Sequence, residues 1–420
     1  MNALNRRIEQ RLQQLPVSVA LQLPGGQRIG PAHPAVMLRM RDAASLARLV
    51  AGQVGALGEA VVEGRVEIHG RMRDLMLAVA ELLPKDPTVP DHHWWSPMLL
   101  RLRSLAAHTR ERDAEHIQFH YDVSDDFYTL WLDPRRVYSC AYYRTDDMTL
   151  AQAQESKLDH ICRKLDLKPG ERYLDVGCGW GALLLWAAEH YGVRATGITL
   201  SRNQCARVQQ MIAERGLGDQ VDVLLCDYRD LKTDRPFDKI SSVGMFEHVG
   251  RACMVSYFEA LMQLLTPGGM VLNHGITAGG IDNMQVGGGM GDFIERYIFP
   301  GGELIHVSHV LREMAKAGLE AVDVESLRPH YARTLWAWSD ALETQLDDAR
   351  AVLAASSDFG RAERILRAYR LYLAGCAMSF ERGWITLHQV LATKPDGQLG
   401  SGRMRGAQAS YPFRRDYMYK

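Results

Sequence analysis

A glycine-rich turn between a strand pattern and an apolar helix constrains this chain more than any other segment. Residues 174–181 read LDVGCGWG, which overlaps the end of the strand pattern RYLDV (172–176) and precedes the helix pattern ALLLWAAEHYG. Glycines at such a place let the backbone turn sharply and approach a ligand closely, and the start of a helix favours a carboxylate or phosphate. The segment therefore predicts a ligand-binding turn between a strand and a helix.

Strands and helices continue to alternate after this turn. Near-continuous apolar strands with helices between them are typical of a parallel, doubly wound sheet, so we expect a Rossmann-like α/β domain. Residues 303–392 are expected to be mostly helical. The strands that carry this prediction are VRATGIT (193–199), VDVLLCD (221–227), KISSVG (239–244) and MVLNHG (270–275).

The first 90 residues predict a small α+β domain. It would contain the strands VSVALQL (17–23), AVMLRM (35–40), AVVEG and RVEIHG, with helices over 42–52 and 71–83. A four-proline linker (84–97) and a basic amphipathic helix (98–112) follow. The expected organisation is thus the small domain at 1–90, linker and basic helix at 91–115, the α/β domain at 116–393 and a basic, aromatic tail at 394–420.

Composition excludes several functional classes. With 49 basic and 50 acidic residues the formal net charge is -1, which argues against a polybasic nucleic-acid binder. The seven cysteines include no C-x-x-C pair, so we expect neither a disulfide framework nor a metal site. The first residues lack the apolar stretch of a signal peptide, and no run reaches the roughly 18 apolar residues of a membrane span. We expect a cytoplasmic protein that at most lies on the inner membrane surface.

The spacing of the glycines narrows the choice of ligand for this turn. A dinucleotide-binding dehydrogenase would need G-x-G-x-x-G and an acidic residue near the end of the second strand. Here the spacing is G-x-G-x-G, and the second strand ends in Gly197-Ile198-Thr199. The turn resembles the first motif of class I S-adenosylmethionine methyltransferases, with a dinucleotide site or a purely structural turn left as alternatives. Asp227 and Asp230, at the end of the third strand, suit either cofactor contact or simple solvation.

A longer set of motifs in a fixed order carries a more specific resemblance. Together they resemble the family of cyclopropane-fatty-acyl-phospholipid synthases and mycolic acid cyclopropane synthases, over residues 116 to 392. The motifs are FHYDVSDDFY (119–128), YSCAYY (138–143), LDVGCGWG (174–181), GITLSRNQ (197–204), MFEHVG (245–250), NHGI (273–276), RYIFPGG (296–302), HYARTLWAW (330–338) and YLAGCAMSF (372–380).

The resemblance implies an activity and partners. It implies a class I methyltransferase fold with helical additions that transfers a methylene from S-adenosylmethionine to the cis double bond of an unsaturated phospholipid acyl chain at the membrane surface. Family members are often dimeric, so a homodimer is implied as well. Residues 17–83 also faintly resemble a sterol-carrier-like lipid-binding fold.

Site residues follow from the same resemblance. It assigns a bicarbonate site to Cys140 (through its backbone), Glu247, His274 and Tyr331, and Cys376 matches a cysteine that the family marks as active-site. The residues that it assigns to S-adenosylmethionine are Tyr138, Ser139, Tyr173, Asp175, Gly177, Cys178, Gly179, Trp180, Gly181, Thr199, Leu200, Ser201, Asn203, Gln204, Asp227, Tyr228 and Arg229.

The implied chemistry explains why such residues would be needed. An alkene is a poor nucleophile but a sulfonium methyl is a strong electrophile, so no metal is required. Attack leaves a carbocation, and ring closure needs a base for one proton; bicarbonate would serve, held by donors such as His274 and Tyr331 and by Glu247 as acceptor. Cys376 suits a pocket wall better than a reactant. Rings expected to face the cation are Tyr142, Tyr143, Phe246, Tyr297 and Trp336.

One departure from the family pattern leaves the product open. Members commonly read His-Thr-Ile where this chain reads His274-Gly275-Ile276, and a glycine-rich, nearly uncharged segment (276–293) follows. That segment is either a mobile surface loop or a lid or tunnel wall. Loss of a different proton would give a methyl-branched or methylene chain, so a fatty-acyl C-methyltransferase is the alternative. A non-reacting lipid carrier is a second alternative. Trp94 and Trp95 beside the basic helix, or the basic tail, suggest membrane docking.

Overall fold

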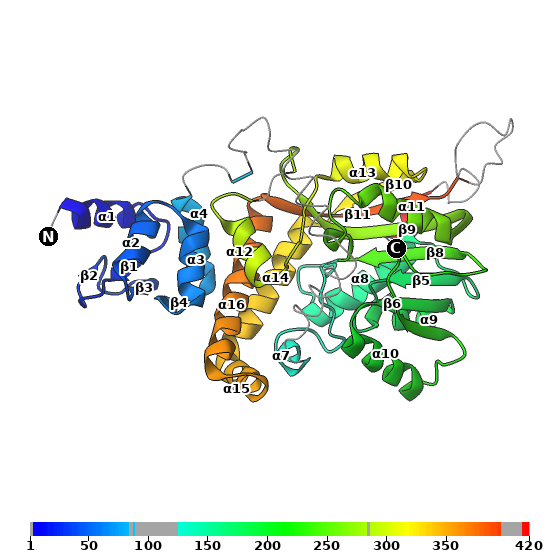
Figure 1. The fold of residues 1–420 in the computed structure, drawn as a ribbon, viewed down its shortest axis with the longest axis horizontal. Coiled ribbons are helices and arrows are strands. Elements are labelled where there is room, and N and C mark those ends of the chain that lie inside the picture. Colours follow the sequence, from blue (N-terminus) through cyan, green and yellow to red (C-terminus); the bar gives the residue numbers. More distant parts are fainter. Residues whose placement is uncertain (1–2, 84–86, 89–124, 284–285, 396–413, 420) are drawn as a thin grey trace.

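The structure is a computed structural model that describes residues 3–83, 87–88, 125–283, 286–395 and 414–419. The expected linker and basic helix, with Trp94 and Trp95, lie outside the described residues. Figure 1 shows the N-terminal domain at one end of the molecule and the large sheet at the other, with helices α12, α14 and α16 between them. The molecule is therefore built from two α/β units joined through a helical layer.

The N-terminal domain is a four-stranded sheet covered by helices. Its strand order is β2-β1-β3-β4, with β1 and β3 parallel and the other pairs antiparallel. The predicted strand AVVEG is wrong: those residues end helix α3, because Ala60, Val61 and Val62 continue its apolar face and the helix ends just before Gly64, whose φ is +73°. The elements are α1 (Ala3–Gln13), β1 (Val19–Gln22), β2 (Arg28–Ile29), β3 (Val36–Met40), α2 (Ala43–Val50), α3 (Val54–Val62), β4 (Val66–Gly70) and α4 (Met72–Leu82).

The large domain contains a seven-stranded sheet in the order β10-β11-β9-β8-β5-β6-β7. Strands β5 to β9 are parallel, which confirms the predicted doubly wound sheet. The expectation of a mostly helical 303–392 missed two strands, and β11 runs antiparallel to both of its neighbours. The strands are β5 (Arg172–Val176), β6 (Arg194–Thr199), β7 (Val221–Leu225), β8 (Phe237–Val243), β9 (Leu265–Ala278), β10 (Glu320–Ser326) and β11 (Ile385–Thr393).

Helices flank this sheet, and some of them lie between the sheet and the N-terminal domain. Several begin at side chains that cap free backbone N–H groups: Thr149 and Gln152 form a capping box at α8, and Ser201 caps α10. The helices are α7 (Asp125–Thr129), α8 (Leu150–Lys164), α9 (Ala182–Tyr191), α10 (Arg202–Glu214), η1 (Phe246–His248), α11 (Met254–Leu264), α12 (Met290–Tyr297), α13 (Val307–Lys316), α14 (Arg328–Thr344), α15 (Leu346–Ser356), α16 (Phe359–Glu381) and η2 (Asp416–Met418).

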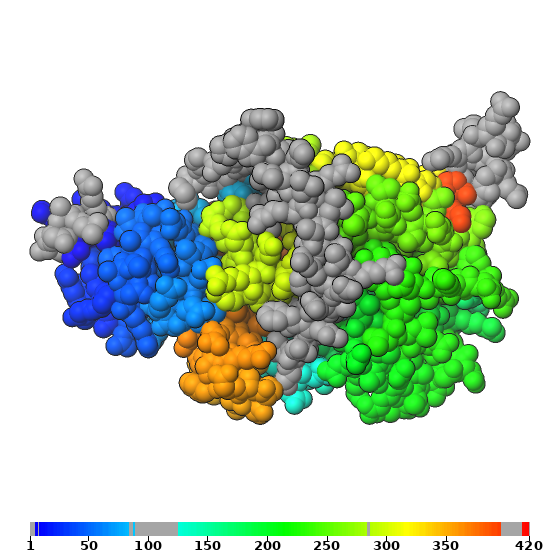
Figure 2. Space-filling view, viewed as in Figure 1, coloured from blue at the N-terminus to red at the C-terminus, as the bar shows by residue number. Residues whose placement is uncertain are grey.

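The two domains share one apolar core. Buried side chains run without a break from the N-terminal sheet through α14 and α16, so Leu21 and Leu373 belong to the same cluster. Helices α3 and α4 pack against α12 and α16, and Figure 2 shows the blue N-terminal lobe against the yellow-green and orange segments. At the other end of the molecule, Met418 of the tail is fully buried and packs with α8, so this part of the tail belongs to the core of the large domain.

Candidate active site

The glycine turn after β5 has the backbone that its sequence predicts. Gly177, Gly179 and Gly181 have φ values of +78°, +54° and +80°, a region that side chains with a Cβ rarely adopt. A Cβ on Gly177 would also lie 3.0 Å from Cγ of Met245. The turn leads directly into α9, whose N-cap is Gly181. Glycine is thus needed both for the conformation and for the close approach of the loop after β8.

A cavity of about 160 Å³ opens at this turn, beside the carboxyl ends of β5, β6 and β8. Ligands of open α/β sheets bind at this edge, where the strand order reverses. Most residues that the resemblance assigned to the cofactor line it: Tyr138, Ser139, Asp175, Gly177, Cys178, Gly179, Trp180, Thr199, Leu200, Gln204, Asp227, Tyr228 and Arg229.

Four of the assigned residues do not line this cavity. The Tyr173 hydroxyl bonds to Ser241 inside the core, and Gly181 packs against Val208. Ser201 caps helix α10 by accepting from the Gln204 N–H at 3.3 Å. The Asn203 side chain donates to Asp125 at 3.3 Å on the surface. These residues shape the loop and the helix start around the cavity.

Lys157 is a cavity residue that sequence reasoning missed. It lies on α8 with its side chain fully buried, and its Nζ donates to the Ser139 hydroxyl at 2.8 Å. Burial lowers its pKa to about 8, partly offset by the nearby Asp175 carboxylate. Burial also raises the pKa of Asp175 to about 6, against a hydrogen bond of 2.6 Å from Ser241. The sequence offered no clear signal for Lys157, because α8 carries many polar side chains and several of them, such as Gln154 and His160, are buried as well.

A second, largely apolar cavity of about 270 Å³ adjoins the first. The predicted catalytic residues Cys140, Glu247, His274, Tyr331 and Cys376 all line it. Both cavities share four lining residues, so they meet there. The shared residues are Tyr138, Ser139, Gly244 and His248.

Glu247 and His274 each point an unpaired atom at this site. Both side chains are buried and line the apolar cavity, and neither Oε2 of Glu247 nor Nε2 of His274 has a hydrogen-bond partner among the described residues. Oε1 of Glu247 is held by the Ile276 N–H at 2.7 Å. Buried polar atoms are rarely left unpaired unless a ligand or water completes them. The pair therefore fits a small molecule that donates to a carboxylate and accepts from an imidazole.

The protonation of the pair follows from its surroundings. Burial raises the pKa of Glu247 to about 7, although the Ile276 N–H opposes this shift. Burial, together with the charges of Lys157 and Lys164, holds the pKa of His274 well below its usual range. The Gln389 side-chain amide donates to Nδ1 of His274 at 3.1 Å, which leaves the proton on Nε2. His274 is thus a neutral donor toward the cavity.

These groups match bicarbonate, which has acceptor oxygens and one donor hydroxyl. The N–H of His274 would bond an oxygen, the Glu247 carboxylate would accept from the hydroxyl, and the buried lysines nearby would favour the negative charge. The residues present therefore fit the anion that the family resemblance implies.

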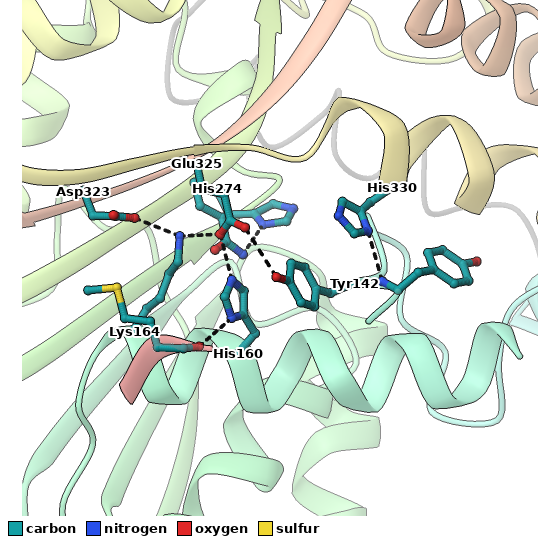
Figure 3. Close-up of polar contacts among 10 residues, drawn as sticks. Tyr142, His160, Lys164, His274, Asp323, Glu325 and His330 are labelled. Carbon is teal, nitrogen blue, oxygen red and sulfur yellow. Dashed lines mark hydrogen bonds and ion pairs between the residues drawn. The ribbon is translucent and has the colours of Figure 1, made fainter. Parts of the chain in front are cut away.

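A buried polar network lies behind His274, as Figure 3 shows. Lys164 is fully buried and pairs with Asp323 at 3.0 Å and with Glu325 at 2.6 Å. Burial opposes ionisation of Glu325, but the hydrogen bond from His160 and the Lys164 charge outweigh it and lower its pKa to about 2. The two ring nitrogens of His160 face Glu325 at 2.8 Å and the Met418 carbonyl at 3.0 Å. These two contacts of His160 link the tail to the network around Glu325.

The aromatic rings along the apolar cavity differ from the predicted ones. That prediction was wrong, because Tyr142 stacks on His160 at 4.1 Å and Trp336 packs under Arg73 at 4.3 Å, outside the cavity. Tyr143, Phe246 and Tyr297 do not line it either. The rings that line it are Tyr138, Phe293, Phe299, Tyr331, Tyr372 and Phe380.

The two cysteines of the cavity are thiols. Burial raises the pKa of Cys376 to about 12 and that of Cys140 further. A nucleophilic cysteine needs a lowered pKa, so both side chains serve as apolar wall.

Gly275, at the position where the family resemblance leads one to expect threonine, is packed by Phe246. A Cβ at residue 275 would overlap the Phe246 ring and lie 3.1 Å from Oε1 of Glu247. The ring therefore occupies the space that a side chain at 275 would take, directly beside the Glu247 carboxylate.

Comparison with known proteins identifies the family. A family model described as mycolic acid cyclopropane synthetase matches residues 108–390. The chain belongs to this family. It is 46% identical to a probable fatty acid methyltransferase of Pseudomonas putida, over 91% of this chain and 94% of that protein. It is 39% identical to cyclopropane mycolic acid synthase 1 of Mycobacterium tuberculosis, over 66% of this chain and 96% of that protein.

Solved structures agree with this family and with the cofactor. The cyclopropane synthase MmaA2 from Mycobacterium tuberculosis matches with a TM-score of 0.62 at 37% identity, covering 67% of this chain and 98% of that one. Mycolic acid cyclopropane synthase CmaA1 in complex with SAH and CTAB matches with a TM-score of 0.61 at 39% identity, over 67% and 98%. The protein is an S-adenosylmethionine-dependent methyltransferase, and the dehydrogenase alternative is dropped. Among the described helices, none has the length and apolar composition needed to cross a membrane.

Proposed function

We propose that this protein transfers the methyl carbon of S-adenosylmethionine to the cis double bond of an unsaturated phospholipid acyl chain and closes a cyclopropane ring. The observation that carries the proposal is the meeting of two cavities at Tyr138, Ser139, Gly244 and His248. One cavity is lined by the glycine turn and suits the cofactor; the other is lined mainly by apolar side chains and suits an acyl chain.

The proposed reaction proceeds in two bond-forming steps. One alkene carbon forms a bond to the methyl carbon while the bond between the methyl carbon and sulfur breaks. This step leaves a thioether on the cofactor and a carbocation on the other alkene carbon. A proton then leaves the new methyl group, and the electron pair of that C–H bond closes the three-membered ring. Bound S-adenosylmethionine supplies the electrophilic methyl group.

The protein would contribute positioning and a place for the proton. Glu247 and His274 would hold bicarbonate through their unpaired atoms, with Tyr331 on the same wall, and bicarbonate there would supply the proton acceptor. The apolar wall, including Cys140 and Cys376, would exclude water that could trap the cation. The rings of Tyr331 and Tyr372, which line the cavity, would stabilise the positive charge.

One observation favours a second candidate, a fatty-acyl C-methyltransferase that leaves a branched or methylene chain. The Phe246 ring fills the space beside Gly275 and Glu247, so the surroundings of the proton acceptor differ from those of a chain with threonine at that position. The relative from Pseudomonas putida is also named a fatty acid methyltransferase. Loss of a proton from a chain carbon next to the cation, in place of the new methyl, would give the methyl-branched alkene. A hydride shift from the methyl-bearing carbon to the cation, followed by loss of a proton from the methyl, would give the methylene chain.

The test is to incubate the protein with S-adenosylmethionine and vesicles of cis-monounsaturated phosphatidylethanolamine and phosphatidylglycerol. Released esters are analysed by mass spectrometry before and after mild catalytic hydrogenation. A gain of one methylene unit that resists hydrogenation supports ring closure, whereas the same gain followed by uptake of hydrogen supports the branched product. No S-adenosylhomocysteine with any unsaturated lipid would favour the non-reacting carrier. A parallel assay with free oleate separates phospholipid from fatty-acid use.

A further inference from the structure

The apolar cavity does not end in the catalytic domain. The cavity that carries Glu247 and His274 is also lined by the inner face of the N-terminal sheet and by α3 and α4. Figure 1 shows the order of these parts, with the N-terminal domain, then α12 and α16, then the large sheet. The N-terminal residues at the far end of the cavity include Leu21, Leu38, Val61, Val66, Leu75 and Val79.

We infer that the N-terminal domain holds the methyl-terminal end of the acyl chain while the double bond lies beside Glu247 and His274. This inference rests on the proposed function and adds a binding site for the distal half of the substrate. The family model begins at residue 108, so the domain lies outside the part of the chain that the model covers.

The chemistry of the wall decides which end of the lipid it takes. Every N-terminal residue that lines the cavity is uncharged and apolar: aliphatic side chains, glycines and the thioether of Met76. A phosphate or carboxylate there would lose its hydration without gaining hydrogen bonds or counter-charges, which is costly. The hydrocarbon end has no polar group to desolvate, and its transfer from water to an apolar cavity is favourable. The head group of the lipid must therefore lie elsewhere.

The junction between the domains keeps this cavity continuous. The Gly55 N–H donates to the Gly288 carbonyl at 2.8 Å, and a Cβ on Gly55 would overlap the backbone of Gly289. A Cβ on Gly58 would lie 3.2 Å from the Phe293 ring. Helix α3 can approach the glycine-rich segment this closely only because glycines lie on both sides.

The glycine-rich segment is thus part of the wall. Val286, Met290 and Phe293 line the cavity next to the N-terminal residues. Ion pairs lie between the domains as well, between Arg296 and Glu59 at 2.9 Å and between Arg73 and Asp340 at 2.6 Å. For the described residues of the segment, 276–283 and 286–293, a tunnel wall agrees with these contacts and a free surface loop does not.

A photoreactive lipid tests the inference directly and without catalysis. The full-length protein is irradiated with vesicles of phosphatidylglycerol whose cis-9 acyl chain carries a diazirine on its penultimate carbon, and the cross-linked peptides are identified by mass spectrometry. We expect cross-links within residues 12–82, the part of the N-terminal domain that lines the cavity. Cross-links found only beyond residue 125, or none within 3–83, would overturn the inference. Cross-links within 12–82 without any methylated product would support the acyl-binding site in the N-terminal domain and reject the proposed reaction.

A pair of tryptophan variants on α4 supplies the second test. Val79 lines the cavity, whereas Leu77 on the same helix is 44% exposed and does not. V79W should shorten the chamber and lower kcat/KM for 18-carbon chains by about tenfold relative to 14-carbon chains, as expected when methylenes lose their pocket. L77W should keep the wild-type ratio. An unchanged ratio in a folded V79W, checked by its thermal unfolding, would contradict the inference.

Discussion

Replacement of Glu247 by glutamine tests the catalytic site most sharply. The variant E247Q keeps Oε1, which accepts from the Ile276 N–H at 2.7 Å, and so keeps the loop in place. It replaces the unpaired Oε2 with an amide that donates where the carboxylate would accept. Loss of a group that positions the proton acceptor should lower kcat by about 10²–10⁴-fold.

The same variant should lose activity but gain free energy of unfolding. The pKa of Glu247 is raised from 4.5 to about 7 by burial, so the folded protein holds this proton more tightly than the unfolded chain. As pH rises from about 4.5 to about 7, stability is lost, and above pH 7 the ionised carboxylate costs about 3 kcal/mol. Because glutamine does not ionise, E247Q should gain about that much relative to wild type between pH 5 and pH 8.

The assay combines two measurements on both proteins. Urea unfolding at pH 5 and pH 8 gives the free energies of unfolding of both proteins. The change between pH 5 and pH 8 in the difference between E247Q and wild type measures the contribution of Glu247 ionisation. Initial rates of S-adenosylhomocysteine release are measured from pH 6 to pH 9, with total carbonate adjusted so that bicarbonate stays constant. Wild-type activity should rise with pH through about 7, since Glu247 must be ionised to accept a hydrogen bond, and E247Q should lack this step.

E171Q is the matched control. The Glu171 carboxyl also has a raised pKa through burial, but it lies outside both cavities, so its replacement should leave kcat and the pH profile of the rate unchanged. If E247Q kept wild-type activity, or if its stability relative to wild type were the same at pH 5 and pH 8, the argument that Glu247 is a buried, titrating ligand of the proton acceptor would be refuted.

Three further outcomes are expected. K164M should lower the free energy of unfolding by about 1.5–3 kcal/mol in urea, because it removes the cation that pairs with the partly buried carboxylates of Asp323 and Glu325. K168M, at an exposed pair, should cost less than about 1 kcal/mol. C376A should keep kcat within about threefold of wild type, since a wall residue makes no bond to substrate; complete loss of turnover would show that the thiol reacts. G177A should weaken S-adenosylmethionine binding in calorimetry by about tenfold, because its φ of +78° and the nearby Met245 both oppose a Cβ.

Sequence reasoning was reliable where local pattern decides structure. The strands at 172–176 and 193–199 and the helices between them were predicted within a residue or two, because apolar runs bounded by glycine encode them locally. The glycine turn was predicted for the same reason, since positive φ values require glycine. The ordered motifs also placed Glu247, His274 and Tyr331 on one cavity.

It failed where an element depends on distant partners. Strand β10 carries Glu320, Asp323 and Glu325, which look like a solvated segment, but two of these carboxylates pair with the buried Lys164 of α8. The segment AVVEG has the composition of a strand yet ends a helix that packs on α16. The aromatic residues next to the motifs were assigned to the cavity by position in the sequence, whereas the direction of each side chain decides which rings reach it.

The sequence by itself determined the class I sheet, the cofactor turn and the identity of the polar residues, because each is written in short-range spacing. Only the tertiary structure decided that Glu247 and His274 leave atoms unpaired at the same cavity, since that depends on how η1 and β9 pack. It also decided that the N-terminal domain closes that cavity, through a contact between Gly55 and Gly289 that lie far apart in the chain. Packing between such distant segments leaves no periodic signal in a single sequence.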